Sequence, residues 1–424
     1  MKKNLVVCIV LIAAVLLVTG NTLKVDSKMS AKALTKADYT SIYSTKTKLS
    51  EEDMVEQLFL NALEDFSFKS CSEVFEENNK NYLYSPVSLY YALSIAASGA
   101  SGSTEEEILK VLEVKDSEEL VLQCGSLYRQ LYRNNKYADL RIANSLWLDK
   151  SVDGQPVNYS GDYLKKASDS YYASVYETDF SDERTGRDIG QWIKENTDDT
   201  LGENYEVDRN QVMSIINTVY FKSPWKDKFS KRATREDKFY LDDGDTVNCQ
   251  FMNKGNCSGI LYQGDGFSRG SLRLKNGTME FILPDKGIKV GDIISSTDRL
   301  KEAFTGGEGM NGDITWKIPK FTNNDSNDLV KALKSMGIKT AFSETADFSG
   351  IADVPLFISK INQNTYVNVD EEGAEASAFT EIGVKATAVM GETMEMILDR
   401  PFIYGIRSEE GVLLFIGVCY NPCN

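Results

Sequence analysis

The stretch MSIINTVYFKSPW, residues 213–225, gives the clearest indication of the fold. Its first part, Met213–Phe221, is a near-continuous apolar run. Such runs are typical of strands buried on both faces, whereas a strand with one wet face alternates apolar and polar residues. The stretch therefore predicts a strand inside a large sheet that other layers of structure cover on both sides.

Helical patterns flank this strand in the sequence. Residues 85–100, SPVSLYYALSIAASGA, begin with serine and proline, which favour the first turn of a helix. Residues 187–202 place three apolar residues on one helical face, and residues 327–337 repeat apolar side chains at the i, i+3, i+4, i+7 spacing before a glycine. Helices are therefore predicted in these three ranges.

Strand patterns lie between the helices and dominate the end of the chain. Residues 238–252 predict a hairpin with an Asp-Gly turn, and residues 394–420 predict two strands joined by a Glu-Gly turn. Within each of these two ranges the strands are not separated by helices, and the sequence shows no second linker. Residues 51–424 are therefore predicted to form a single α+β domain with mixed or antiparallel sheets.

The composition excludes several classes of function. The chain has 47 basic and 63 acidic residues, a net charge of −16, which argues against a general nucleic-acid-binding protein. It contains no histidine, so Ser-His and Cys-His catalytic pairs and imidazole-based zinc sites are excluded. We therefore expect no catalytic residue, no cofactor and no metal site, and we predict that the protein is not an enzyme.

The N-terminus has the pattern of an export signal. Two lysines precede an uncharged apolar run of 14 residues, Leu5–Val18, which is shorter than the ~20 residues of a membrane span. Residues 1–20 are predicted to be a signal peptide of bacterial style, so the protein is expected to be secreted, with an uncleaved cell-surface tether as the alternative. Residues 21–50, with six lysines and two aspartates, are predicted to be a solvated linker.

Beyond the signal, the chain has an even number of cysteines, namely Cys71, Cys124, Cys249, Cys257, Cys419 and Cys423. An even number in an exported chain permits disulfides, but a domain of this length builds a core without them. The thiols are therefore expected to be free or incidentally paired.

The stretch DEEGAEASAFTEIGVKATAVMG, residues 370–391, divides its charges in a regular way. Alternate residues of a strand point to opposite faces. One alternate set is uncharged and small or apolar: Ala374, Ala376, Ala378, Thr380, Ile382, Val384 and Ala386. The other set holds all the charge: Glu375, Ser377, Phe379, Glu381, Gly383, Lys385 and Thr387. Because a buried charge is strongly destabilising, this division predicts a loop that can insert as a strand into a packed sheet.

Five segments, taken together and in order, resemble the serpin family, the serine-protease-inhibitor superfamily. They are residues 81–89 (NYLYSPVSL), 215–225 (IINTVYFKSPW), 369–380 (VDEEGAEASAFT), 399–407 (DRPFIYGIR) and 411–422 (GVLLFIGVCYNP). The resemblance implies an α+β fold with three β-sheets, eight or nine helices and an exposed, insertable reactive loop.

The resemblance also implies a suicide mechanism of inhibition. The target serine protease cleaves the loop and stays attached as an acyl-enzyme, and the loop inserts as an extra strand of the main sheet before the ester is hydrolysed. Serpin loop insertion is itself a known case of strand addition and of strain release. The implied product is a covalent 1:1 complex with the protease, and the inhibitor is expected to be a monomer without a heparin site.

The resemblance assigns roles to two groups of residues. The hinge of the loop comprises Glu371, Glu372, Gly373, Ala374, Glu375, Ala376, Ser377 and Ala378. The region where the sheet opens comprises Ser85, Pro86, Ser88, Asn217, Trp225 and Gln363. Family members commonly have a histidine where this chain has Gln363, so opening controlled by histidine protonation is not expected here.

Two ways of counting along the loop give different reactive bonds. Counting from Glu371 in the hinge indicates the bond Thr387-Ala388, whereas counting back from Pro401 indicates the bond Met390-Gly391. Val389, Met390 and Gly391 therefore stay as alternatives. The candidate side chains are small or aliphatic, which suits the shallow apolar specificity pocket of elastase-like or some subtilisin-like proteases.

A non-inhibitory serpin is the alternative interpretation. Such a protein would serve as a surface or binding protein and would be cleaved as a simple substrate. These members usually carry proline or charge on the inserting face of the hinge, and this sequence has neither there. Inhibition is therefore the favoured interpretation.

Overall fold

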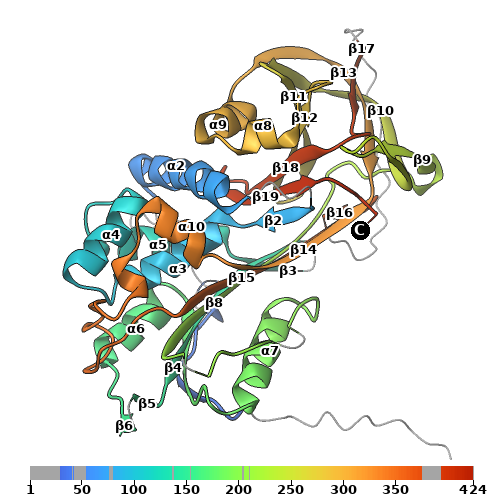
Figure 1. Ribbon diagram of the computed structural model, residues 1–424. Coiled ribbons are helices and arrows are strands. Elements are labelled where there is room, and N and C mark those ends of the chain that lie inside the picture. The colour runs from blue at the N-terminus through green and yellow to red at the C-terminus, as the bar shows by residue number, and fades with distance from the viewer. Residues whose placement is uncertain are drawn as a thin grey trace, which may run out of the picture.

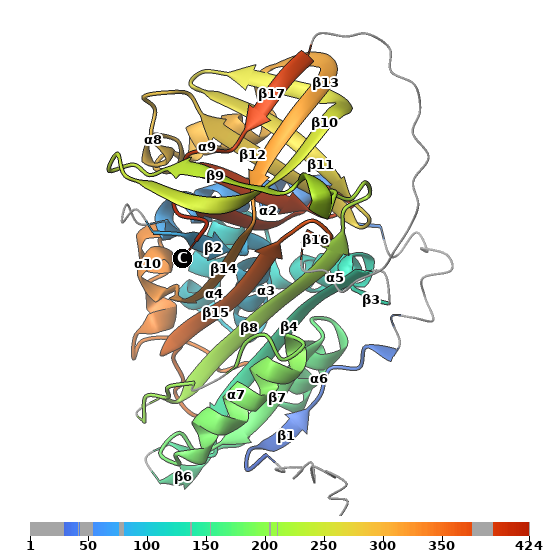
Figure 2. The ribbon, with the colours of Figure 1, turned by 90° about the vertical axis from the view of Figure 1, so that its right-hand side faces the viewer.

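The computed structural model describes residues 29–40, 42, 54–75, 80–135, 138–152, 154–202, 205–209, 211–374 and 393–423. In these residues, two large β-sheets and one two-stranded sheet are combined with helices that pack around them (Figures 1 and 2). This arrangement confirms the predicted α+β architecture with three sheets.

The eight-stranded sheet, here called sheet A, contains the strand predicted from residues 213–221. That strand is β8 (Met213–Pro224), and it is buried over nearly its whole length, as the apolar run predicted. The spatial order of the sheet is β1 (Lys32–Thr35), β7 (Ala173–Thr178), β4 (Ala138–Asp149), β8, β16 (Gly373–Ala374), β15 (Lys360–Val369) and β14 (Phe321–Asp328), with β3 (Arg133–Asn135) paired to β4.

The nine-stranded sheet lies above sheet A in Figure 1. Its order is β17 (Thr393–Ile397), β13 (Glu308–Pro319), β10 (Thr246–Gly264), β11 (Phe267–Leu274), β12 (Gly277–Pro284), β18 (Phe402–Arg407), β19 (Leu413–Cys419) and β2 (Tyr82–Tyr84), with β9 (Arg235–Tyr240) paired to β10. Strands β9 and β10 form the predicted hairpin. A separate short hairpin joins β5 (Ser151–Val152) to β6 (Gln155–Pro156).

Helices cover both faces of sheet A (Figures 1 and 2). On one side lie α2 (Gln57–Val74), α3 (Pro86–Ala97), α4 (Gly102–Leu112), α5 (Ser117–Leu131) and α10 (Val330–Met336), and on the other lies α7 (Arg184–Asn196). Helix α6 (Gly161–Asp169) adjoins β7, whereas α8 (Val290–Ile294) and α9 (Thr297–Thr305) adjoin the nine-stranded sheet. None of the helices in the described residues is long and apolar enough to cross a bilayer.

The three predicted helices are confirmed as α3, α7 and α10. Every residue of α3 is buried, because the helix lies between sheet A and the surrounding helices, which explains its lack of a polar face. Ser85 precedes α3 in an extended conformation and Pro86 occupies its first turn. Helix α7 buries Ile189, Trp192 and Ile193 against Trp147, Tyr176 and Ile216 of sheet A.

Two expectations need correction. The range 21–50 is not a solvated linker throughout, because Lys32–Thr35 form strand β1, which pairs with β7 at the edge of sheet A. The ring of Tyr39 stacks on that of Tyr132 with 5.2 Å between centroids. Residues 394–420 contribute three strands rather than two, since β17 pairs in parallel with β13 before the chain turns into β18 and β19.

Candidate functional site

The candidate site lies where β16 enters sheet A between β8 and β15 (Figure 2). Gly373 and Ala374 pair with Pro224 and Ser223 of β8, and Ala374 also pairs with Val369 of β15. Beyond this point β8 and β15 pair directly with each other.

We call this direct pairing the seam. It is parallel and joins Ser214–Val219 of β8 to Lys360–Thr365 of β15. The hinge therefore already occupies the end of the seam with the first two residues of a strand.

The backbone at the hinge approaches β8 too closely for any side chain at residue 373. A Cβ atom on Gly373 would lie 2.4 Å from the carbonyl oxygen of Ser223 and 2.6 Å from Cα of Pro224. The glycine is thus required by a close approach of two backbones. Ala374, the first member of the uncharged alternate set, is buried with 1% exposure.

The two hinge glutamates are held by cationic side chains. Glu371 is 4% exposed, and its carboxylate accepts hydrogen bonds from Lys320 Nζ at 2.8 Å and Thr234 Oγ1 at 2.7 Å. Glu372 bonds Lys228 Nζ at 2.7 Å and Lys231 Nζ at 3.2 Å.

These contacts keep both carboxylates ionised. Burial by itself raises the pKa of Glu371, but the hydrogen bonds from Lys320 and Thr234 outweigh it, so the pKa lies below its ordinary value. The hydrogen bond from Lys228 lowers the pKa of Glu372, and Lys231 adds to this effect against a smaller contribution from burial. The hinge is therefore fastened by charge-assisted hydrogen bonds at neutral pH.

Trp225 fastens the hinge backbone. Its indole Nε1 donates to the carbonyl oxygen of Asp370 at 2.8 Å, and its backbone N–H donates to that of Glu372 at 2.9 Å. The carbonyl between them, that of Glu371, accepts from the backbone N–H of Phe229 at 3.1 Å. Three successive carbonyl groups at the start of the hinge are thus satisfied by the segment that follows β8.

Gln363 links the seam to the start of helix α3. The side chain is 1% exposed, and its Oε1 accepts from the backbone N–H of Ser85 at 2.7 Å. Its Nε2 donates to the carbonyl oxygen of the same residue at 2.8 Å. Across the seam Gln363 is the register partner of Asn217, whose Nδ2 donates to Asn144 Oδ1 on β4. The predicted sheet-opening residues Ser85, Asn217 and Gln363 therefore come together behind the seam.

Several buried polar atoms along the seam lack a protein partner in the part of the chain that the structure describes. On the two seam strands they are Oγ1 of Thr218, Oδ1 of Asn217 and Asn362, and Nδ2 of Asn364, and next to the seam they are Oγ of Ser88 on α3 and Nδ2 of Asn144 on β4. A buried polar atom without a partner is destabilising by about 1–3 kcal/mol. The seam is therefore held less firmly than an apolar pair of strands.

The segment after α7 crosses the front of the seam. The hydroxyl of Tyr205 accepts a hydrogen bond from Asn362 Nδ2 on β15 at 3.1 Å. Gly186 allows this segment to lie against α7, since a Cβ there would stand 2.5 Å from the carbonyl oxygen of Tyr205.

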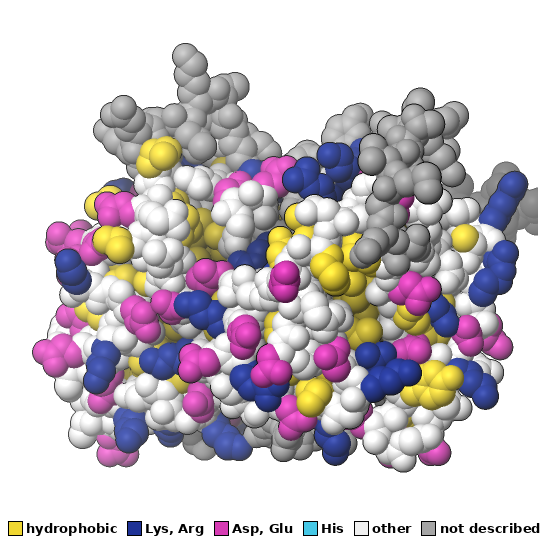
Figure 3. All heavy atoms as spheres, turned by 90° about the horizontal axis from the view of Figure 1, so that it is seen from above, with side chains coloured by type: hydrophobic (Ala, Val, Ile, Leu, Met, Phe, Trp, Pro, Cys, Tyr) yellow, Lys and Arg dark blue, Asp and Glu magenta, His cyan; other side chains and the backbone are white. Residues whose placement is uncertain are grey.

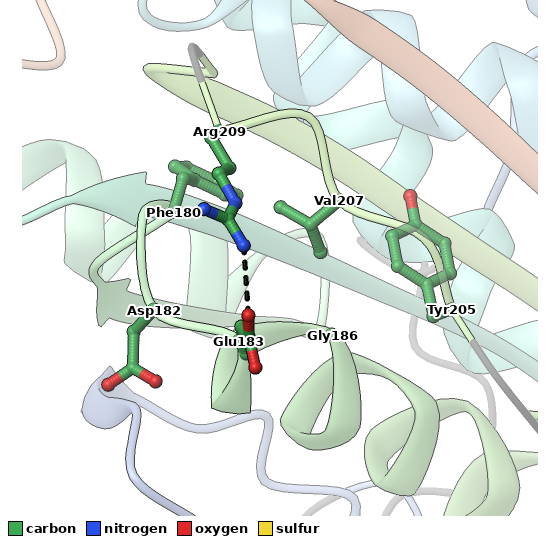
Figure 4. A pocket seen from close by; sticks show the side chains of 7 residues that line it. All are labelled: Phe180, Asp182, Glu183, Gly186, Tyr205, Val207 and Arg209. Atoms are coloured by element: carbon green, nitrogen blue, oxygen red, sulfur yellow. Dashed lines mark hydrogen bonds and ion pairs between the residues drawn. The ribbon is translucent and has the colours of Figure 1, made fainter.

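A shallow hollow lies beside this crossing, between the start of α7 and residues 205–209 (Figure 4). At its rim Arg209 Nη2 pairs with Glu183 Oε1 at 2.9 Å, an exposed ion pair. The hollow is lined by Phe180, Asp182, Glu183, Gly186, Tyr205, Val207 and Arg209. The hollow therefore lies where residues 205–209 pass the first turn of α7.

Other predicted site residues lie outside the described residues. These are the second half of the hinge, Glu375, Ala376, Ser377 and Ala378, and the reactive-bond candidates Thr387, Ala388, Val389, Met390 and Gly391.

On the face of the molecule seen from above in Figure 3, acidic and basic side chains are interspersed.

The sequence analysis did not identify the residues that contact the hinge glutamates and the seam. Lys228, Lys231 and Lys320 hold the hinge glutamates, and Tyr205 and Asn144 contact the seam. Lys228 and Lys231 lie on the segment that follows β8, and Lys320 lies between β13 and β14, with no motif that marks them. The two adjacent acidic residues Glu371 and Glu372 are the signal that could have indicated these cations, because a buried carboxylate needs a charged partner.

Comparisons with known proteins agree with this geometry. The sequence model of the family described as Serpin (serine protease inhibitor) matches residues 61–422. An alpha-1-antitrypsin-like protein of Tamias sibiricus is 29% identical over 362 residues, which cover 82% of this chain and 84% of that protein.

Two further comparisons cover a similar length. The leukocyte elastase inhibitor of Sus scrofa is 27% identical over 369 residues, covering 81% of this chain and 93% of that protein. The native crystal structure of the thermophilic serpin tengpin superposes with a TM-score of 0.81 at 25% identity, covering 92% of this chain and 99% of tengpin.

Proposed function

This chain belongs to the serpin family, and from that premise we propose that it is an irreversible suicide inhibitor of serine proteases. The observation that carries the proposal is the position of Gly373 and Ala374, which already lie between β8 and β15 at the end of the seam. After cleavage of the loop, the following residues would extend β16 along the seam as a full strand. That insertion would carry the attached protease away from the reactive end.

The register of β16 supports this proposal. Continued along the seam, the pairs Ala374–Ser223 and Ala374–Val369 bring Ala378 level with Val219 and Thr365. The same register brings Thr380 between Asn217 and Gln363, which are partners of each other in the seam.

The chemistry at these positions is complementary. Thr380, the polar member of the uncharged set, would meet the two polar side chains, and its hydroxyl can donate to Asn217 Oδ1, which lacks a protein partner among the described residues. Ile382 would meet Ile215 and Ile361, which are buried. The charged alternate set would face the side of the sheet that α7 covers.

The weak seam supplies part of the driving force. An inserted strand would pair with both β8 and β15, and each added hydrogen bond between strands contributes about 1 kcal/mol net. It could also supply partners for the unpartnered polar atoms of the seam. The hinge ion pairs and Trp225 oppose premature insertion by keeping the start of the loop at the end of the seam. The protein is therefore proposed to be metastable until the loop is cut.

We further propose an elastase-like, or some subtilisin-like, target and a secreted location. The candidate reactive-bond residues Thr387, Ala388, Val389 and Met390 are small or aliphatic. A relative over most of the chain is a leukocyte elastase inhibitor. The apolar N-terminal run supports export, either free or tethered to the cell surface.

The test is a denaturing gel under reducing conditions of the protein mixed with elastase. We expect a band at the summed mass that survives denaturation, and the mass of the C-terminal peptide in the cleaved protein will identify the reactive bond. Elastase whose active serine has been blocked is the control and should form no such band. Cleaved protein should also melt at a higher temperature than intact protein.

A non-inhibitory serpin predicts different results. It would be cleaved by elastase, subtilisin or trypsin without a stable complex, and cleavage would leave its melting temperature unchanged. That combination would overturn the proposed inhibition.

A further inference from the structure

We propose that Cys249 and Cys423 form a disulfide that ties the C-terminal tail to strand β10. Cys249 lies near the start of β10, in the part that pairs with β9, and is buried. Cys423 follows β19 at the end of the chain and is exposed. This inference does not depend on the inhibitory function.

The two thiols are neighbours in the folded chain. Cys423 Sγ donates to the carbonyl oxygen of Asn248 at 3.4 Å, which places it beside the residue that precedes Cys249. The thiol of Cys423 is also close enough to Cys249 to contribute to the raised pKa of Cys249. A disulfide requires this kind of proximity, because its Cβ atoms stand only about 3.5–4.5 Å apart.

Hydrogen bonds hold the C-terminal residues 420–423 in a position that suits disulfide formation. The side-chain oxygen of Asn81 accepts from the backbone N–H groups of Tyr420 at 2.8 Å and Asn421 at 2.9 Å, and its Nδ2 donates to the carbonyl oxygen of Asn421 at 2.6 Å. The side chain of Asn421 in turn accepts from the backbone N–H of Cys423 at 3.0 Å. These hydrogen bonds set the position of Cys423. None of them uses its thiol, so a disulfide with Cys249 would leave them intact.

The two cysteines are suited to different steps of thiol–disulfide exchange. Cys423 is exposed, so its thiolate can attack a dissolved low-molecular-weight disulfide, forming a mixed disulfide and releasing one small thiol. Cys249 then loses its proton to solvent and attacks the sulfur of Cys423, releasing the second small thiol. In total, two protein thiols are oxidised to one disulfide and the small disulfide is reduced to two thiols.

Cys419 is the competing partner for Cys423, but the contact of Cys423 Sγ with the carbonyl oxygen of Asn248 places that thiol beside Cys249. Cys419 is the last residue of β19, it is 1% exposed, and burial raises its pKa well above the ordinary value. Burial also raises the pKa of Cys249, to about 12, with a further contribution from the neighbouring Cys423. An exposed attacking thiol is therefore needed to start the exchange, and among these three only Cys423 is exposed.

The disulfide would have a consequence for any cleaved form of the protein. Residues 375–392, which include all the candidate reactive bonds, lie between Cys249 and Cys423 in the sequence. A cut at any candidate reactive bond would leave the C-terminal fragment covalently attached to the body through the disulfide. The fragment would be released on a denaturing gel only after reduction.

The experiment uses the full chain and oxidised glutathione as the oxidant. After oxidation and alkylation of the remaining thiols, peptide mapping without reduction should give one cross-linked peptide that contains Cys249 and Cys423. The oxidised protein should melt several degrees above the reduced protein, because the closed loop restricts the unfolded chain. Cys423→Ser and Cys249→Ser should each abolish the cross-link and the rise in melting temperature.

Two control variants make the outcome decisive. Cys257→Ser, on the same strand β10 but away from the tail, and Cys419→Ser should both retain the cross-link. A cross-link that includes Cys419, or full alkylation of both Cys249 and Cys423 after oxidation of the folded protein, would overturn the proposal. Retention of the C-terminal fragment in a non-reducing gel of the Cys423→Ser protein would also overturn it.

Discussion

The side-chain amide of Gln363 holds both backbone polar atoms of Ser85, accepting from its N–H at 2.7 Å and donating to its carbonyl oxygen at 2.8 Å. One end of this contact is the strand that must move if sheet A opens. The other end is the start of a completely buried helix. The contact therefore connects the seam to the rigid part of the core.

Replacing Gln363 should weaken the native state. Gln363→Ala removes two buried hydrogen bonds and leaves a cavity, so we expect a loss of about 2–4 kcal/mol in the free energy of unfolding, measured by urea denaturation. Asn368→Ala on the same strand is the control, because its side chain is only half-buried and bonds the exposed Thr322. An equal effect of the two substitutions would contradict the assigned role of Gln363.

Gln363→His should introduce a pH dependence that the natural chain lacks at this position. A histidine with its neutral ring bonded to Ser85 resists protonation, so the variant should lose stability as the pH falls below about 6.5. The wild-type side chain cannot titrate. The measurement is the difference in unfolding midpoint between variant and wild type at neutral and mildly acidic pH, and a constant difference would rule the idea out.

The Glu371 carboxylate should contribute to stability only when ionised. Glu371→Gln breaks the ion pair with Lys320, and we expect it to lower the free energy of unfolding by about 1–2 kcal/mol at neutral pH. Because the folded-state pKa of Glu371 is lowered, this contribution is present above the ordinary value of 4.5 and is lost as the pH falls through the folded-state pKa.

The matched control for this substitution is Glu372→Gln. Its carboxylate is more exposed and one of its partners, Lys231, is a surface side chain, so its effect should be smaller. The check is the pH dependence of the difference between each variant and wild type. An unchanged difference for Glu371→Gln down to about pH 3 would contradict the ion-pair assignment.

Insertion should depend on which alternate set of the hinge carries charge. In the register given above, Ala378→Glu would place a carboxylate against Val219 and Thr365, both fully buried. It should abolish the denaturation-resistant protease complex while cleavage continues, because the charge cannot be buried.

Ser377→Glu is the matched control, since it adds the same charge one residue earlier on the opposite face. It should retain most of the complex. The measurement is the fraction of cleaved inhibitor that stays attached to elastase, and equal fractions for the two variants would contradict the proposed register.

The hydroxyl of Tyr205 should slow the opening of the seam. Tyr205→Phe removes the hydrogen bond with Asn362, worth about 1 kcal/mol, and leaves the ring in place. We expect heating to convert the variant to a loop-inserted form faster than the wild type. Tyr240→Phe, at an exposed tyrosine, is the control, and equal conversion rates for the two variants would show that Tyr205 does not restrain the seam.

Asp325 on β14 should be destabilising at neutral pH. Burial raises its pKa to about 6, and the hydrogen bond from the backbone N–H of Leu83 at 2.6 Å offsets only part of this effect. The folded protein therefore holds this proton more tightly than the unfolded chain, and the contribution of Asp325 to stability improves as the pH falls from about 6 towards 4.

Asp325→Asn keeps an acceptor oxygen for Leu83 but removes the charge. Its gain in stability over wild type should be largest above about pH 6 and should shrink towards pH 4. The measurement is the difference in unfolding midpoint over this range. A difference that does not change with pH would contradict the raised pKa.

Local patterns in the sequence were enough to predict two of the elements that lie at the seam. The apolar run at Met213–Phe221 predicted β8, and the Ser-Pro start predicted α3. The range 21–50 was misjudged because the short strand β1 has no apolar run, and it forms only because the edge of β7 offers it hydrogen-bond partners. The third C-terminal strand was missed for the same reason, since β17 depends on pairing with β13.

The alternating charge after Gly373 was determined by the sequence alone, because the two faces of a strand follow from its period of two residues. Only the tertiary structure decided where that strand begins in the sheet, which lysines hold Glu371 and Glu372, and that Gln363 bonds a residue 278 positions away. It also brought Cys423 beside Cys249. Such contacts join segments far apart in the chain, and they form only when the sheets close around a common core, so no local pattern in the sequence specifies them.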